Sequence, residues 1–456
     1  MTLPGKAPAT RRTRGPNLRP LFLAVTLGLC LALPLPHAAG AEPTTPDRVI
    51  RQAEAQILNG AAEDGITALT TLGPQADRAQ ELRRLWALAM AQARSDRPRA
   101  ALPHLERLVS LAPENATFRV ELAAALERAG QTDRARYHYD LARGAGLDSD
   151  LGQEIARRID RIDRTKTWEG SFGIALTPES NAARRTAADT IFIGNLPFRL
   201  RPEAQAKAAQ GVKLNLGIAA LPALGPDLRA RIGLSAEARL FEGTTPDDVQ
   251  TTAELGLVHF ADRSQRIGGG LLFSKRWIDA QDYSTLQGGY LTWSRSLGAQ
   301  ARSGVALTLL HDVTDFDGAA LRRTTRNLAA LRLTHLVSGQ MQLRLGLTLE
   351  RSDSRLPWES GDRTMISIGA QYAFRGGVLA DLDLSTGHLT RDATDPFFGI
   401  RRKEDRHIAQ LRLIHRDWTI GGFAPVLELG IEKQRSNNSI YSYDNTRAAI
   451  GLTRRF

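Results

Sequence analysis

The final segment of the chain, residues 446–456, alternates between apolar side chains and small or polar ones. Ala448, Ile450, Leu452 and Phe456 fall on one face of a strand with a two-residue period. A terminal aromatic residue that closes such a strand is typical of outer-membrane β-barrels. A soluble β-domain that ends in Phe has the same tail, so the distinction depends on the alternating segments upstream.

The first 41 residues have the three parts of a secretory signal peptide. Five basic residues and no acidic residue come first, an apolar run follows at 21–35, and Ala39-Gly40-Ala41 offers small residues for cleavage. A transmembrane anchor is the alternative, but a spanning helix needs about 20 apolar residues, and Pro34 and Pro36 interrupt this run. We therefore predict that residues 1–41 are removed after export.

Cysteine content and charge limit the chemistry of the exported chain. Its only cysteine, Cys30, lies inside the predicted signal, so the mature chain forms no disulfide and no cysteine-based metal site. The formal charge of +11 includes five positive charges of the signal, which leaves 11 − 5 = +6. The sequence has no cluster of basic and aromatic residues of the kind that binds single-stranded nucleic acid. We expect no cofactor, no metal ion and no nucleic-acid partner.

Residues 47–164 are rich in Ala, Leu, Arg and Glu, with apolar residues at helical spacing. Several of them recur after 34 positions, which is the period of the tetratricopeptide repeat. A plain amphipathic helical bundle is the alternative. His104 and His138 recur at the same spacing, and we expect surface or packing roles for them rather than metal binding. Solenoids of this kind bind peptides or partner domains in a groove. The recurring pairs are Leu88 and Leu122, Ala89 and Ala123, Ala101 and Ala135, Leu105 and Tyr139, and Leu108 and Ala142.

From Trp168 onward the apolar period changes to two. In the segment 341–349, for example, Met and Leu alternate with Gln, Arg, Gly and Thr. Such a pattern fits a membrane barrel, or a soluble sandwich whose apolar face packs on a core. The pattern predicts fourteen strands, at about 168–176, 210–221, 228–241, 250–260, 265–278, 284–296, 299–311, 325–337, 340–351, 364–374, 377–389, 405–416, 424–434 and 445–456.

The connections between these segments distinguish the two folds. Short connections mostly follow the even segments and long polar ones mostly follow the odd segments, as in barrels with short periplasmic turns and longer outer loops. The short stretch 279–283 is an exception, and a misplaced strand there is the alternative. We predict an α-helical tetratricopeptide-like solenoid at 47–164, followed by a 14-stranded antiparallel transmembrane β-barrel at 165–456. Four tryptophans near predicted strand ends fit an interfacial girdle: Trp168, Trp277, Trp293 and Trp418.

The polar face of the predicted barrel carries charges of both signs, which suits a polar lumen. We do not expect an enzyme, because the histidines lie on separate segments and no sequence-local nucleophile motif is present. The chain also has no His-Glu-x-x-His, Walker or dinucleotide-binding run. The predicted luminal charges are Arg229, Arg231, Arg344, Arg412, Glu237, Asp381, Asp383 and Glu428.

Short motifs follow this architecture in a fixed order. Pro178-Glu179-Ser180-Asn181 comes after the first predicted strand, and three more motifs precede the terminal aromatic. In the order and spacing of these motifs the chain resembles the surface lipoprotein assembly modifier family of Gram-negative bacteria, although Glu179 stands where that family has Asp. The later motifs are Arg401-Arg402-Lys403-Glu404-Asp405, Gly421-Gly422-Phe423-Ala424-Pro425 and Arg435-Ser436-Asn437-Asn438-Ser439-Ile440-Tyr441. The candidate family residues are Glu179, Ser180, Asn181, Asp405, Pro425, Ser436 and Asn437.

The resemblance implies a translocator in the outer membrane, with the helical domain in the periplasm. Its clients would be surface lipoproteins or secreted haem- and metal-acquisition proteins, carried from the periplasm to the cell surface. Its other partners would be outer-membrane lipid, periplasmic chaperones and the barrel assembly machinery, which we expect to read Phe456 as an insertion signal. An exopolysaccharide-export channel and a passive porin-type channel are the alternatives.

Overall fold

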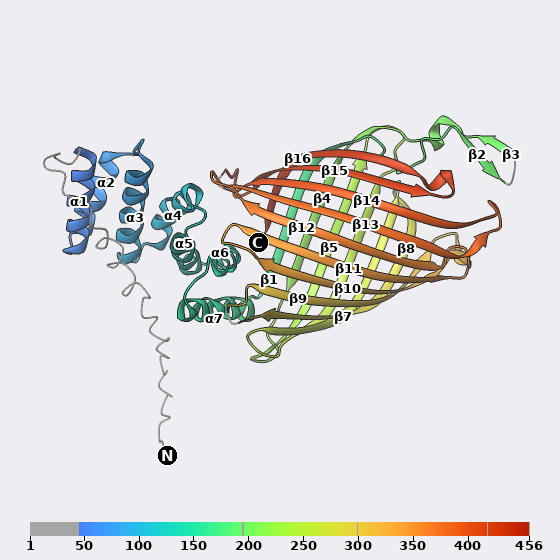
Figure 1. Ribbon diagram of the computed structural model, residues 1–456. Coiled ribbons are helices and arrows are strands. Elements are labelled where there is room, and N and C mark those ends of the chain that lie inside the picture. The colour runs from blue at the N-terminus through green and yellow to red at the C-terminus, as the bar shows by residue number, and fades with distance from the viewer. Residues whose placement is uncertain (1–44, 194–195, 299, 417, 456) are drawn as a thin grey trace, which may run out of the picture. The chain divides into compact units, whose positions relative to one another are not determined.

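The computed structural model describes residues 45–193, 196–298, 300–416 and 418–455. The predicted signal peptide (1–41) and Phe456 lie outside this part of the chain. The described part consists of a helical region followed by a closed antiparallel barrel (Figure 1). This arrangement confirms the predicted fold class. None of the helices in the described part is long and apolar enough to cross a membrane.

Seven α-helices occupy the described part of the N-terminal region. Side chains fix the start of three of them, because Asp77, Asn115 and Asp148 each accept a hydrogen bond from the backbone N–H three residues later, at 2.8, 3.2 and 2.9 Å. The helices are α1 (Thr45–Leu58), α2 (Ala62–Leu72), α3 (Arg78–Arg94), α4 (Pro98–Leu111), α5 (Ala116–Arg128), α6 (Thr132–Arg143) and α7 (Ser149–Thr165).

The residues that recur every 34 positions form the interior of the helical region. Leu88 of α3 and Leu122 of α5 are each 1% exposed. The small residues Ala101 of α4 and Ala135 of α6 are fully buried, which lets paired helices approach closely. Gly130 closes the α5–α6 hairpin with φ = +80°, a conformation that suits glycine. The helix pairs α3–α4 and α5–α6 are therefore packed by equivalent residues, and their identity as tetratricopeptide repeats stays a prediction.

Within the described residues, fourteen strands close the barrel, and each pairs antiparallel with its neighbours in the sheet. The final strand returns to pair with the first. The barrel strands are β1 (Trp168–Glu179), β4 (Ala209–Ala220), β5 (Leu228–Phe241), β6 (Asp248–Phe260), β7 (Gln265–Ile278), β8 (Gln281–Leu297), β9 (Ser303–Phe316), β10 (Thr324–Leu336), β11 (Met341–Ser354), β12 (Gly361–Ala373), β13 (Val378–Asp395), β14 (Ile400–His415), β15 (Ala424–Ser436) and β16 (Tyr443–Arg455).

Side-chain alternation gives the barrel two chemically different faces. Leu176, Leu271 and Ile450 are each about two-thirds exposed, at 66, 67 and 68%. They belong to an apolar outer belt that continues from strand to strand. The intervening positions carry polar and charged side chains, such as Arg231 and Glu254, which contact each other. A belt this apolar on the outside and charged on the inside is the membrane-barrel arrangement and not that of a soluble sandwich.

The connections differ from the prediction at the end of the barrel that carries the longest loop. The predicted loop 390–404 is mostly strand, because β13 and β14 continue beyond the apolar belt as a polar hairpin. The connection after β7 is a two-residue turn, with φ of 50° at Asp279 and 61° at Ala280, so no strand is misplaced there. The loop after β1 contains its own hairpin, formed by β2 (Thr190–Ile193) and β3 (Leu196–Arg199).

Candidate functional site

Ion pairs between neighbouring strands line the inner wall of the barrel. Arg231 of β5 donates from Nε to Glu254 of β6 at 3.0 Å. Arg276 of β7 donates from Nε to Asp248 of β6 at 2.8 Å. The luminal charges predicted from the sequence all alternate with apolar outer positions on their strands, so they share this inner face. Two further pairs of this kind are Arg326–Asp312 at 2.8 Å and Arg406–Glu432 at 2.6 Å, and Arg344 of β11 reaches across β12 to Asp381 of β13 at 2.5 Å.

A polar cavity of about 370 Å³ lies inside the barrel beside the junction of its first and last strands. Side chains of β1, β4–β7, β15 and β16 line it, and charged groups of both signs predominate. This cavity is unfavourable for an apolar segment, whereas a polar polypeptide would find hydrogen-bond donors and acceptors in it. The charged residues of the lining are Glu179, Arg184, Lys213, Glu237, Arg239, Asp248, Arg276, Glu428 and Arg447.

The junction of β1 and β16, called the seam below, has an interrupted ladder. The two strands pair from Ser171 to Leu176 and again at Glu179, but they are not paired at Thr177 and Pro178. On its other edge, β1 pairs with β4 without a break over its whole length. Proline has no backbone N–H and is found in sheets at edges and irregular positions. In the half of β1 that ends at Glu179, the seam therefore has fewer backbone contacts than the opposite edge of the same strand.

Side chains join the two strands beyond this interruption. Asn445 of β16 donates from Nδ2 to Glu179 at 2.7 Å and accepts at Oδ1 from the backbone N–H of Asn181 at 3.0 Å. Ser180 donates its backbone N–H to the carbonyl of Thr446 at 2.9 Å, and its Oγ accepts from the N–H of Thr446 at 2.8 Å. We call these five residues the clasp. Glu179, Asn181 and Asn445 are nearly inaccessible, at 4, 2 and 2% exposure.

Two ion pairs span the inner side of the seam region. Lys213 of β4 contacts Glu428 of β15 at 3.5 Å, so the pair extends across both β1 and β16. Arg184, in the loop after β1, contacts Glu432 of β15 at 3.2 Å across β16. Both ion pairs cross β16 beside the interrupted ladder, and neither joins residues of two neighbouring strands.

The other candidate family residues lie elsewhere on the barrel. Asn437, in the β15–β16 loop, ties this loop to the start of β14, because its Oδ1 accepts from the N–H of Lys403 at 2.9 Å and its Nδ2 donates to the carbonyl of Arg401 at 2.8 Å. Ser436 shapes the β15–β16 loop by accepting from the N–H of Asn438 at 3.2 Å. Both residues therefore support loops at the clasp end of the barrel.

Asp405 and Pro425 are separate from these loops. Asp405 lies on the outer face of β14, and its Oδ1 is 2.7 Å from Nδ1 of His388. Pro425 lies near the start of β15, where it pairs with Leu452. The structure thus brings Glu179, Ser180 and Asn181 together at the seam, but it does not gather all seven candidates into one site. The sequence did not predict a role for Asn445 or Thr446, because polar residues within an alternating strand form no recognisable motif.

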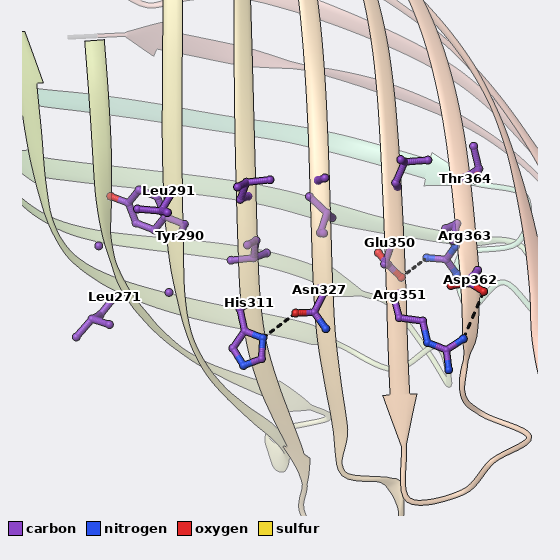
Figure 2. A pocket seen from close by; sticks show the side chains of 17 residues that line it. Leu271, Tyr290, Leu291, His311, Asn327, Glu350, Arg351, Asp362, Arg363 and Thr364 are labelled. Carbon is purple, nitrogen blue, oxygen red and sulfur yellow. Dashed lines mark hydrogen bonds and ion pairs between the residues drawn. The ribbon is translucent and has the colours of Figure 1, made fainter. Parts of the chain in front are cut away.

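A second cavity, of about 1010 Å³, lies along β7–β12 at the boundary of the apolar belt nearer the clasp end of the barrel (Figure 2). Residues paired across the strands form one apolar row, which includes Leu291, Leu309 and Leu349. The next row towards the clasp end is polar. In it His311 contacts Asn327 at 2.8 Å. Arg351 contacts Asp362 at 3.3 Å. The change from one row to the next marks the edge of the surface suited to hydrocarbon.

Known proteins are similar to this chain in sequence. The family model for surface lipoprotein assembly modifiers matches residues 168–456, which span the barrel. The chain belongs to the surface lipoprotein assembly modifier family. Family membership and the closed barrel place the chain in the outer membrane. A relative from Neisseria meningitidis serogroup B, "Surface lipoprotein assembly modifier 1", is 22% identical over 411 residues, 86% of this chain and 80% of its own. A Haemophilus influenzae protein of the same name is 22% identical over 358 residues, 74% and 70% of the two chains.

Solved barrels are similar to this chain only in general outline. An anion-selective porin from Comamonas acidovorans is 12% identical, with a TM-score of 0.35, and the match covers 64% of this chain and 99% of the porin. A Pseudomonas aeruginosa FadL homologue is 7% identical, with a TM-score of 0.39, covering 64% and 90%. Scores this low carry no functional information.

Proposed function

We propose that this chain moves lipoproteins from the periplasm to the cell surface. In this proposal the helical region recognises the client and the barrel provides the route. The supporting observation is the combination, within one member of the assembly modifier family, of a repeat-like helical region and a barrel whose inner wall is charged. The names of the relatives support lipoproteins as clients. They mention no haem- or metal-binding client, so the proposal is restricted to lipoproteins.

The inner wall also bears on the two alternative channels. A polysaccharide pore is expected to offer stacked aromatic surfaces, whereas the described inner wall offers mainly arginine–carboxylate pairs such as Arg344–Asp381 and Arg406–Glu432. A passive porin has no use for a helical region with a repeating interior. Neither the family nor the barrel fold is of an enzymatic type.

Removal of residues 47–164, with the signal and barrel kept, tests the division of labour. The barrel strands carry the complete alternating pattern, so a folded barrel is expected. Display of the client on intact cells, measured by protease accessibility, should fall, and the client should accumulate in the periplasm. The control is the full chain at a matched level of heat-modifiable, folded barrel.

Two results would contradict this proposal. Unchanged display would show that the helical region does not recognise the client. The porin-type channel would be favoured by a different pair of results. Client display would not depend on the full chain, and small-solute permeability would remain the main activity after the deletion.

A further inference from the structure

The seam differs from the other strand junctions in its covalent connections. Each of the other neighbouring pairs in the described barrel consists of strands that follow one another in the sheet and in the chain, joined by a turn or loop. β1 and β16 are neighbours only in space, because the 263 residues 180–442 separate Glu179, the end of β1, from Tyr443, the start of β16. A turn keeps paired strands at high effective concentration and favours reclosure. At the seam this restraint is missing, so separation there breaks no hairpin.

Backbone pairing at the seam is also incomplete. The ladder stops after Leu176 and resumes in the same register only at Glu179, opposite Arg447. Other irregular ladders occur next to their own connecting hairpins, as between Arg276 and Trp277. In the half of the seam that ends at Glu179, the two strands are therefore held together mainly by the clasp. Glu179, Asn181 and Asn445 are nearly inaccessible, so water or another polypeptide can replace the hydrogen bonds of the clasp only once the two strands separate there.

The two sides of the seam suit the two parts of a lipoprotein. On the outer side, Leu176 and Ile450 are paired with each other and expose 66 and 68% of their surface. On the inner side, Lys213 and Glu428 form an ion pair across the seam. Acyl chains favour hydrocarbon and are costly to move into a charged, hydrated lumen. A polar polypeptide has the opposite preference.

We propose that the β1–β16 seam is where the lipid-bearing segment of a client crosses the barrel wall. The client polypeptide lies on the charged inner side, and its acyl chains lie against the apolar outer side at Leu176 and Ile450. The clasp holds the seam shut between clients. This inference rests on the proposed translocator function and adds to it the chemical class of the ligand, a polypeptide with covalently attached acyl chains, and its path.

A reversible crosslink tests the path. The only native cysteine is Cys30, so a Leu176→Cys, Ile450→Cys pair can be oxidised selectively. Directly opposed residues in an antiparallel ladder have Cα atoms within the range that a disulfide spans. The matched control is Leu345→Cys with Ile368→Cys, an outward-facing pair on β11 and β12. The readout is protease-accessible client on intact cells, at equal amounts of folded barrel.

We expect the oxidised seam pair to lose client display, the reductant to restore it, and the control pair to display normally in both states. If the first pair lowers the amount of folded barrel, Ile174→Cys with Leu452→Cys replaces it. Undiminished display with a crosslinked seam would overturn the proposed path. Equal loss in the control pair would overturn it too, because barrel rigidity would then be the cause. Failure of the translocator function itself shows differently, as unchanged display when the whole chain is deleted.

Discussion

Asn445 contributes both ends of its amide group to the clasp. Replacement of Asn445 by Ala removes the donor to Glu179 and the acceptor for the N–H of Asn181. The Glu179 side chain is only 4% exposed, so water replaces the lost bond poorly. We expect the free energy of unfolding to fall by about 1–3 kcal/mol, the cost of leaving a buried polar group unpaired. Urea titration of the folded barrel, followed by heat-modifiable gel migration, measures this change.

Asn437 is the matched control for this prediction. It makes two comparable hydrogen bonds at the neighbouring hairpin, but its side chain is exposed, so water can replace them. Asn437→Ala should cost less than about 1 kcal/mol. An equal loss in the two variants would show that burial at the seam is not what makes Asn445 important.

Gly451 of β16 is paired with Ala175 of β1. A Cβ atom at this position would overlap the carbonyl oxygen of Ile174, a contact that requires backbone movement. Gly451→Ala should therefore destabilise the folded barrel by about 1–3 kcal/mol, in the range of overpacking substitutions. The same urea titration measures the loss.

Gly173, on the opposite strand of the seam, provides the control. A Cβ atom there would come no nearer than 3.8 Å to another atom, which is ordinary contact. Gly173→Ala should be neutral, or stabilising by up to about 1 kcal/mol, because alanine restricts the unfolded chain. Similar losses at both glycines would mean that a general need for glycine, and not close approach at Gly451, determines the result.

Residue-level roles were predictable only where a motif pointed to them. The Glu179-Ser180-Asn181 motif directed attention to the end of β1, and the structure places it at the seam. Its partners are the side chain of Asn445 and the backbone of Thr446, which lie more than 260 residues later in the sequence. Their pairing follows from the register of β16 on β1, and register is a property of the closed sheet, not of either segment alone.

Among the elements, α5 has a titratable side chain whose burial gives a pH-dependent prediction. Burial raises the pKa of the Glu121 carboxyl to about 6, although Arg128 and Arg158 partly oppose this shift. Because the pKa in the folded state exceeds 4.5, the ordinary value for glutamate, the carboxylate destabilises the fold above pH 6. This destabilisation is relieved as the pH falls from 6 towards 4.5. A pKa raised from 4.5 to about 6 corresponds to at most about 2 kcal/mol of stability.

Glu121→Gln should therefore stabilise the helical region at pH 7.5, and its advantage should shrink by pH 5. Thermal unfolding of the helical circular-dichroism signal of the full chain, in detergent, measures the difference between variant and native protein at each pH. Buried His138, whose pKa lies well below its usual range because of desolvation, opposes this trend, but it is common to both proteins and cancels. An advantage independent of pH would contradict a titrating Glu121.

The elements themselves were largely predictable from periodicity. Segments 228–241 and 265–278 coincide with β5 and β7, because an apolar outer face and a polar inner face enforce strict alternation. Strand ends beyond the apolar belt were not predictable in the same way. β13 continues to Asp395 through polar residues on both faces, and such a sequence also fits a loop. The β2–β3 hairpin has only four residues in each strand, too few to establish a period.

For the whole molecule, family membership, the fold class and the outer-membrane location were correctly predicted, because each depends on features that extend over the chain. Client recognition, the path of the client and the boundaries of the domains remain proposals. Client recognition and the path of the client depend on interactions with molecules that the sequence of this chain does not encode. Orientation in the membrane is a further property of the whole molecule, and it can be tested directly.

The two ends of the barrel differ in chemistry, which predicts their orientation. β1 begins and β16 ends at the same end as the turn 261–264, and the clasp and the polar row beside Arg351 lie at the other end. An exported barrel with an even number of strands places both chain ends in the periplasm. An epitope tag after Arg355, in the β11–β12 loop, should therefore bind antibody on intact cells. A tag after Arg263 should bind only after the outer membrane is permeabilised.

Both tagged chains must first show heat-modifiable migration, so that unfolded protein does not contribute to labelling. Reversed labelling of two folded variants would invert the orientation and place the clasp in the periplasm, where the seam would open on the wrong side for delivery to the surface.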